Sequence, residues 1–180
     1  MPLIPSRLNT LKLIAIIPIL MLIGCTGAPK NLEPVQSFEL ERYLGTWHEI
    51  ARLDHRFERG LSEVTADYSM REDGGVRVLN RGINPQGEEK IAEGKAYFIG
   101  DQNIGSLKVS FFGPFYGGYH IAKLKEDYSM SLVIGPNYDY AWILARKPNP
   151  SAADCQAFSA KAQALGVDTD AWIWVQSCND

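Results

Sequence analysis

The chain has 180 residues, of which 46% are hydrophobic and 22% are charged, and its formal net charge at pH 7 is −3. This length fits one domain, and the composition excludes a disordered chain and a protein with several membrane-spanning helices. The net negative charge argues against a nucleic-acid partner, because nucleic-acid binding requires a basic surface.

The first two dozen residues have the features of an export signal. Arg7 and Lys12 are the only charged residues before Cys25, and residues 13–23 form an uninterrupted apolar run. A run of this length is typical of a signal peptide, whereas a transmembrane helix needs about 20 apolar residues. The Leu-Ile-Gly-Cys sequence at residues 22–25 resembles a bacterial lipobox. That resemblance implies cleavage before Cys25 and acylation of its sulfur and amino group, for example with palmitate.

We therefore expect a signal peptide at residues 1–24, a tether at residues 25–36 and one folded domain at residues 37–180. An ordinary secretory signal followed by an incidental cysteine is the alternative. In lipoproteins of the enteric type, an Asp after the acylated cysteine marks retention in the inner membrane, so Thr26 favours the outer membrane. The folded domain is then expected to face the periplasm.

Alternating apolar and polar residues, separated by turn sequences, predict eight strands in the middle of the chain. We expect these strands at residues 45–53, 63–71, 76–83, 90–99, 106–112, 119–125, 129–134 and 140–146. No long helix interrupts the series, which favours antiparallel pairing of consecutive strands. The predicted fold class is all-β, an eight-stranded up-and-down β-barrel, which can hold one small ligand.

A single helix and a short ninth strand are predicted after the barrel. Ser151 is a candidate helix N-cap because Pro148 and Pro150 precede it, and the alanine-rich sequence that follows favours a helix up to Gly166. The ninth strand is expected at residues 172–175. A helical turn is expected before the barrel, at residues 37–43.

Three motifs occur in order along this series of strands. Gly-Thr-Trp at residues 45–47 opens the first strand, Asn-Tyr-Asp-Tyr at residues 137–140 precedes the eighth, and Arg146 ends it. This pattern resembles the lipocalins, and residues 47–52, 54–61 and 108–119 look much like the bacterial lipoprotein lipocalins related to apolipoprotein D. The resemblance covers residues 38–175. It implies a binding protein for small hydrophobic ligands and allows a homodimer.

Strand direction predicts which residues meet at each end of the barrel. If the first strand rises from the closed end, the eighth strand descends to it, so Trp47 and Arg146 meet there. The guanidinium group can stack on the indole ring, which contributes ~0.5–2 kcal/mol. We therefore assign Gly45, Trp47 and Arg146 a structural role at the closed end. The loops that follow the first, third, fifth and seventh strands gather at the open mouth.

Alternation also predicts which side chains face the interior, since Lys, Arg and Glu should face water. Many of these positions carry small residues, which implies that the lumen is partly empty. Strands at residues 129–134 and 140–146 are apolar on both faces, so their inward parity stays open and an outer helix is expected to cover them. The predicted residues of the cavity wall and mouth are Ala51, Phe57, Leu61, Ala66, Tyr68, Val78, Ala96, Phe98, Val109, Phe111, Tyr116, His120, Tyr138, Tyr140 and Trp142.

Cys155 and Cys178 remain as a pair once Cys25 is acylated. The compartment beyond the inner membrane is oxidising, which favours a disulfide between them over two unrelated thiols. The predicted helix and ninth strand run roughly antiparallel, so the start of the helix lies near the end of the strand, where the two cysteines are.

The sequence contains no motif of a known catalytic site. His48, His55 and His120 lie on different elements without the spacing of metal ligands, so no catalytic residue, metal or cofactor is predicted. The predicted function is a lipid-anchored protein that stores or transports fatty acids or lysophospholipids at the outer membrane. A lipocalin-type enzyme that acts on a hydrophobic substrate, and an envelope scaffold without a ligand, are the alternatives.

Overall fold

The computed structural model describes residues 26–179, so the predicted signal peptide and Cys25 lie outside the described residues. Antiparallel strands close into a barrel, because β1 pairs with β8 on one side and with β2 on the other. This confirms the predicted eight-stranded barrel. The strands are β1 (Gly45–Arg52), β2 (Ser62–Met70), β3 (Val76–Ile83), β4 (Glu89–Phe98), β5 (Ser106–Phe112), β6 (Phe115–Leu124), β7 (Met130–Ile134), β8 (Ala141–Ala145) and β9 (Ile173–Trp174).

The strand bounds lie within one residue of the prediction except at the start of β6. β6 begins at Phe115 instead of residue 119, because Gly113 and Pro114 alone form the turn and Phe112 pairs with Phe115 across it. Residues 115–118 are therefore strand, and their prediction as a loop was wrong. β9 keeps only two of the four predicted residues, and β8 lacks Arg146 at its end.

The helices begin and end where local chemistry requires. α1 (Leu40–Tyr43) is the predicted turn before the barrel, and α2 (Ala152–Leu165) follows β8. The Ser151 hydroxyl accepts a hydrogen bond from the backbone N–H of Asp154, and Gly166 ends α2 at φ 101°, a conformation that favours glycine. A short 3₁₀ helix, Thr169–Ala171, leads into β9, which pairs with β1. Within the described residues, no helix has the length and apolar character needed to cross a membrane.

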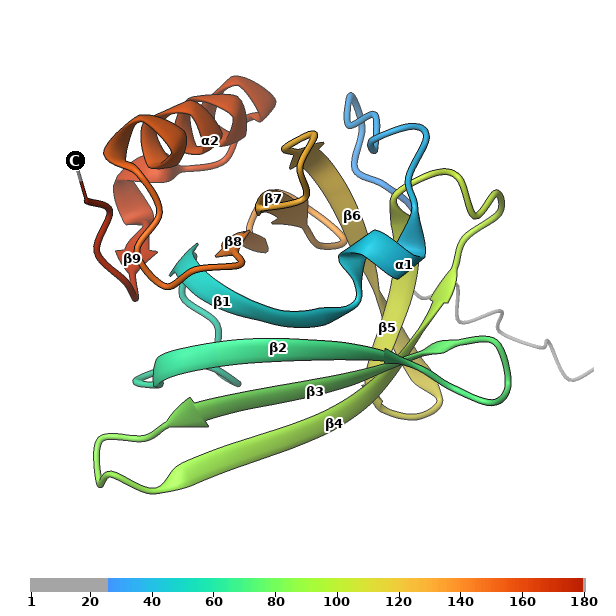
Figure 1. Cartoon of the computed structure of the whole chain (residues 1–180), viewed down its shortest axis with the longest axis horizontal. Coiled ribbons are helices and arrows are strands. Elements are labelled where there is room, and N and C mark those ends of the chain that lie inside the picture. The colour runs from blue at the N-terminus through green and yellow to red at the C-terminus, as the bar shows by residue number, and fades with distance from the viewer. Residues whose placement is uncertain (1–25, 180) are drawn as a thin grey trace, which may run out of the picture.

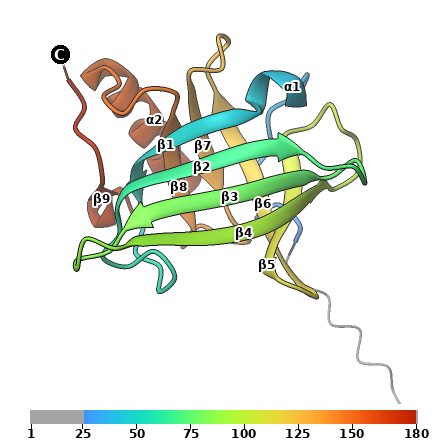
Figure 2. The same ribbon diagram turned by 60° about the horizontal axis from the view of Figure 1, so that its bottom comes forward.

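Two apolar clusters lie on opposite faces of the same strands. Inside the barrel, Trp47, Tyr68 and Val78 belong to one cluster. Outside it, Phe158 and Ala162 of α2 pack on the outer faces of β7 and β8 (Figure 1). This explains why those two strands are apolar on both faces. Figure 2 shows β2, β3 and β4 running side by side on the side of the barrel away from α2.

The predicted disulfide between Cys155 and Cys178 is confirmed, with 6.4 Å between the two Cα atoms. It joins the first turn of α2 to the segment after β9. Next to it, the backbone N–H of Ala152 donates to the carbonyl of Asn179, and the N–H of Asn179 donates to the carbonyl of Pro150. The C-terminal segment is therefore fixed to the start of α2.

Residues 26–36 are bound to the barrel, which corrects the prediction of a tether for this segment. The Val35 N–H donates to the Ile121 carbonyl of β6, and the Gly105 N–H donates to the Val35 carbonyl, both at 2.9 Å. Leu32 is buried in the outer cluster. The Tyr138 hydroxyl donates to the Lys30 carbonyl at 2.8 Å. The segment thus runs along the outside of the barrel from the open end to the closed end.

Candidate ligand-binding site

The interior of the barrel is lined mainly by apolar side chains from β1 to β8. Most of the predicted wall residues lie there, namely Ala66, Tyr68, Val78, Ala96, Phe98, Val109, Phe111 and Trp142. Tyr68, Val78 and Ala96 are buried. Ala66, Val109 and Phe111 point inward but remain partly exposed. Solvent therefore reaches the interior of the barrel along this part of the wall.

The prediction for Ala51 was wrong because β1 contains a bulge. The register of β1 against β8 shifts between Glu49 and Ala51, which interrupts the alternation of faces. Glu49 keeps the inward direction that follows from Trp47 and pairs with Leu144. Beyond the bulge, Ala51 packs in the outer cluster under α2, and Arg52 turns inward beside Trp142.

His120 is also outside the barrel, and the cause is a second bulge. The register of β6 against β7 shifts between Ile121 and Lys123, so Ile121 faces the interior and His120 faces outward. The Nδ1 atom of His120 lies 2.9 Å from the Ser106 hydroxyl, and burial lowers the pKa of the imidazole. His120 belongs to the contact between the barrel and the N-terminal segment.

The predicted residues at the mouth separate into two groups. Tyr116 lies on the outer surface, where the Lys108 ammonium is 5.2 Å from the centre of its ring. Tyr138 packs on the outer cluster and on the N-terminal segment. Both predictions were wrong, since neither side chain lines the mouth. Phe57, Leu61 and Tyr140 do lie at the mouth, around the loop that connects β1 to β2.

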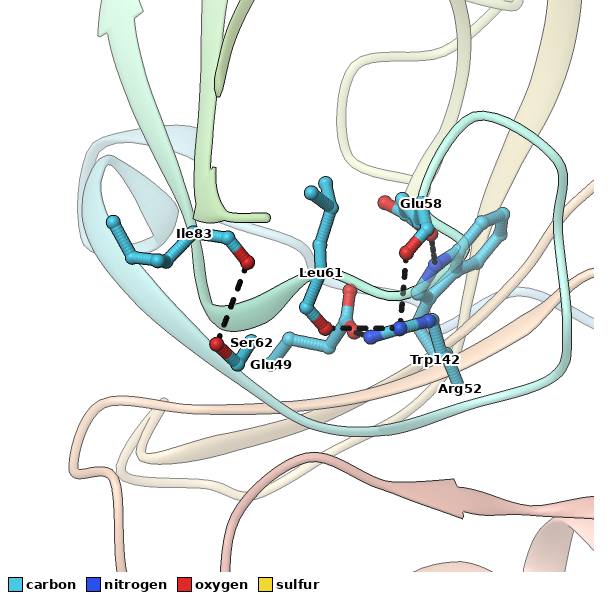
Figure 3. Close-up of polar contacts among 7 residues, drawn as sticks. All are labelled: Glu49, Arg52, Glu58, Leu61, Ser62, Ile83 and Trp142. Atoms are coloured by element: carbon cyan, nitrogen blue, oxygen red, sulfur yellow. Dashed lines mark hydrogen bonds and ion pairs between the residues drawn. The ribbon is translucent and has the colours of Figure 1, made fainter. Parts of the chain in front are cut away.

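A buried ionic cluster holds this loop across the mouth (Figure 3). The Arg52 Nη1 atom donates to Glu49 Oε1 at 2.5 Å, and both side chains are almost completely buried. The Nη2 atom of Arg52 donates to the carbonyls of Glu58 and Leu61 at 3.0 and 3.1 Å. The Glu58 carboxylate accepts a hydrogen bond from the Trp142 indole at 2.9 Å. One guanidinium group thus fixes both β1 and the loop.

Two buried carboxyl groups share this single arginine. Burial, and next the charge of Glu58, raise the pKa of Glu49 to about 8, while Arg52 lowers it. Burial also raises the pKa of Glu58, against the hydrogen bond from Trp142 and the charge of Arg52. We conclude that the pair holds a proton at pH values where exposed glutamates are ionised.

His55 lies in the loop between β1 and β2, next to this cluster. Its ring stacks on Tyr140, with 4.7 Å between ring centres, and on Phe57, with 5.3 Å. The Trp142 ring is 4.9 Å away. Burial and the positive charge of Arg52 lower the pKa of His55 to about 4. The imidazole is therefore neutral near pH 7 and behaves as one member of an aromatic stack.

Hydroxyl groups gather deep in the barrel. The Tyr119 hydroxyl lies 2.9 Å from the hydroxyls of both Tyr43 and Tyr68. Tyr43 also donates to the Ser131 hydroxyl at 3.1 Å. Burial raises the pKa of Tyr43 to about 12, so the network is neutral. It forms a polar floor below the apolar wall.

The predicted contact at the closed end is present. The guanidinium carbon of Arg146 lies 4.0 Å from the centre of the Trp47 ring. Arg146 also donates to the carbonyls of Thr46, Arg42 and Leu44 at 2.8 to 2.9 Å. Gly45, at φ 88°, begins β1 directly beside this guanidinium. These residues seal the barrel and lie at the end opposite the mouth.

Sequence reasoning missed Arg52, Glu58 and His55 as residues of the mouth. Strict alternation from Trp47 places Arg52 on the outside, and only the bulge turns it inward. Five buried side-chain atoms have no hydrogen-bond partner among residues 26–179, and Nε of Arg52 and Oδ1 of Asn80 are two of them. Within the same residues, no cluster of His, Cys, Asp and Glu is arranged to hold a metal ion.

Comparisons with known proteins agree with this architecture. Residues 38–177 match the Lipocalin-like domain family. Outer membrane lipoprotein Blc of Vibrio cholerae serotype O1 is 52% identical over 158 residues, which cover 87% of this chain and 92% of that protein. Outer membrane lipoprotein Blc of Escherichia coli K12 is 50% identical over 159 residues, which cover 87% and 90%.

Two more distant proteins extend the comparison. Apolipoprotein D of Rattus norvegicus is 33% identical over 123 residues, which cover 64% of this chain and 65% of that protein. Among solved structures, insecticyanin from the tobacco hornworm superposes with a TM-score of 0.65 at 19% identity, covering 86% of this chain and 87% of that one. The similarity to insecticyanin concerns the fold alone.

Proposed function

Because the chain belongs to the lipocalin family, whose members bind small hydrophobic ligands, we propose that it binds a fatty acid or a lysophospholipid in its barrel at the outer membrane. Its Blc relatives are named outer membrane lipoproteins, and the lipobox at residues 22–25 agrees with such an anchor. The lipocalins are in general binding proteins, so we assign the chain storage or transport of lipid and no catalytic activity.

The observation that carries this proposal is an apolar inner wall that solvent reaches. Ala66, Val109 and Phe111 face the interior and remain partly exposed. Apolar surface inside a barrel is an unfavourable place for water, and a ligand's hydrocarbon chain would gain free energy by covering it.

Unpaired polar atoms on β1 and β3 support a ligand with a polar end. Nε of Arg52 is a donor and Oδ1 of Asn80 is an acceptor, and both are buried without a partner among residues 26–179. Buried polar atoms are normally satisfied, so a ligand oxygen or hydroxyl would relieve the cost of leaving them unpaired. We place the polar end of the lipid near Arg52 and its chain toward the hydroxyl network of Tyr43.

Titration with a fluorescent fatty acid tests the binding site. Ala66→Phe adds a large side chain to the inner wall and should weaken binding by about tenfold or more, since the ring takes the place of the ligand chain. Thr65→Phe adds the same ring on the adjacent residue, whose side chain faces outward, and should leave the affinity unchanged. Thermal unfolding checks that both variants fold. Equal affinities in two folded variants, or no binding by the parent protein, would refute a ligand in the barrel.

The anchor is tested separately at Cys25. Cys25→Ser should abolish labelling of the protein with radioactive palmitate and release it from the membrane fraction, because the acylated sulfur is lost. The parent protein, expressed in the same cells, is the control. Persistent labelling of the variant would show that Cys25 is not the acylated residue.

A further inference from the structure

The tip of the hairpin between β5 and β6 exposes an apolar surface at the open end of the barrel. Phe112 is 80% exposed and Phe115 is 68% exposed, on either side of Gly113 and Pro114. No Asp, Glu, Lys or Arg occurs between Lys108 and Lys123. Large exposed apolar side chains that lie next to one another indicate a surface with a partner.

Residues just above this tip have the composition of a membrane interface. The Lys108 ammonium lies 5.2 Å from the centre of the Tyr116 ring. These two side chains are on the outer surface of β5 and β6. Phenylalanine at the tip, with tyrosine and lysine above it, is the order found where a protein enters the headgroup region of a bilayer.

The N-terminal segment brings the start of the described chain to the same place. The carbonyl oxygen of Thr26 lies 3.1 Å from the position that a Cβ atom on Gly118 would occupy. Gly118 is three residues from Phe115 on β6, which is ~10 Å along a strand. Cys25 directly precedes Thr26 in the sequence. The residue that follows the proposed lipid anchor therefore lies close to the hairpin tip.

The segment that follows the anchor is held against the barrel. Hydrogen bonds at Lys30 and Val35 and the burial of Leu32 fix it from the mouth to the closed end. The barrel therefore has little freedom to swing away from a bilayer that holds Cys25. The headgroup region of a bilayer leaflet is ~5–7 Å thick. The tip lies ~10 Å from Thr26, which is enough to cross this region and reach the acyl chains.

We propose that the tip of the β5–β6 hairpin inserts into the bilayer that anchors Cys25, so that the mouth of the barrel faces that membrane. This inference rests on the acylation of Cys25 that we proposed above. The partner is the lipid surface itself, and Phe112 and Phe115 are the inserted side chains. A single-chain lipid would then pass between the bilayer and the barrel without crossing the aqueous periplasm.

The insertion is tested with acylated full-length protein in vesicles of phosphatidylethanolamine and phosphatidylglycerol. Phe112→Trp places a fluorophore at the tip, and Met70→Trp places one near the closed end, at a residue that is 50% exposed. Emission of the parent protein is subtracted to remove the four native tryptophans. The tip variant should show blue-shifted emission that lipids with brominated chains quench, and the Met70 variant should show neither. Equal quenching in the two variants would overturn the proposal.

A second measurement follows the transfer of lipid. Phe112→Ser combined with Phe115→Ser should slow the transfer of an anthroyloxy fatty acid from vesicles to the acylated protein on the order of tenfold, the effect of losing one or two buried aromatic contacts. The same double substitution in the soluble Cys25→Ser protein should leave the affinity for that fatty acid in buffer unchanged. An unchanged rate of transfer would overturn the insertion.

The outcomes separate this proposal from the one on which it rests. If no form of the protein binds the fatty acid, the proposed function fails, while the quenching measurement still decides the orientation. If the Phe112→Trp variant is unquenched and the protein forms dimers that the double substitution dissociates, the tip binds a second copy of this chain, and insertion into the bilayer is refuted.

Discussion

Glu49→Gln should change how the stability of the protein depends on pH. In the folded protein, burial and the charge of Glu58 raise the pKa of Glu49 to about 8, whereas a glutamate in the unfolded chain titrates near 4.3. At any pH between these two pKa values, Glu49 is protonated in the folded protein and ionised in the unfolded chain, so unfolding releases a proton. The stability that the protonated group contributes is complete below the unfolded pKa and is lost as the pH rises toward 8.

The size of the effect follows from linkage. Each pH unit between the two pKa values changes the free energy of unfolding by ~1.4 kcal/mol, so the parent protein should lose about 2 kcal/mol from this group between pH 6.5 and 8. The neutral amide of Glu49→Gln keeps an oxygen that accepts the hydrogen bond from Arg52 but does not titrate. The hydrogen bonds from Arg52 to the backbone carbonyls of Glu58 and Leu61 do not involve the substituted carboxylate and should remain.

Urea unfolding followed by tryptophan fluorescence at several pH values measures this difference. The free energy of unfolding of Glu49→Gln, minus that of the parent, should rise by about 2 kcal/mol between pH 6.5 and 8. His55, whose pKa burial lowers, contributes equally to both proteins and cancels in the difference. Glu63→Gln, at an exposed residue of the same open end, should show no such rise. Parallel curves for Glu49→Gln and its parent would refute a protonated carboxyl pair at the mouth.

Three further predictions concern other parts of the molecule. Because burial lowers the pKa of His55 to about 4, its contribution to stability should be lost as the pH falls from 6.5 toward 4, and thermal unfolding of His55→Gln should lack this part of the decline. Trp47→Ala should cost ~3–5 kcal/mol and Arg146→Ala less, and a Trp47→Ala protein with unchanged melting but lost binding would contradict a structural role. Replacing both Cys155 and Cys178 by serine should lower the free energy of unfolding by ~3 kcal/mol without changing fatty-acid affinity, as urea unfolding and titration can check.

The barrel and its closed end could be predicted from the sequence because their signals are local and repeat along the chain. Turn residues at 72–75 and 84–87 mark strand ends, and the strand count alone brings Trp47 to Arg146. The disulfide followed from the antiparallel course of α2 and β9. Each of these inferences needed only the direction of a strand or helix, which a shift of one residue does not change.

The inner wall could be predicted only where the strands are regular. At Ala51 and His120, a bulge in the same strand exchanged the two faces, and alternation carries no signal for where a bulge falls. The same bulge in β1 moved Arg52 inward. The cluster of Arg52 with Glu58 also depends on a loop whose path is set by tertiary contacts. No pattern within residues 54–61 reveals those contacts.

The covering of β7 and β8 by α2 also determines how freely the sequence can vary around the barrel. All five residues of β7, Met130–Ile134, are buried, because one face meets the lumen and the other meets α2. The first five residues of β4, residues 89–93, are all exposed. Among related sequences, we therefore expect few substitutions in β7 and β8. On the side formed by β2 to β4, we expect the outward residues to vary and the inward residues to stay similar.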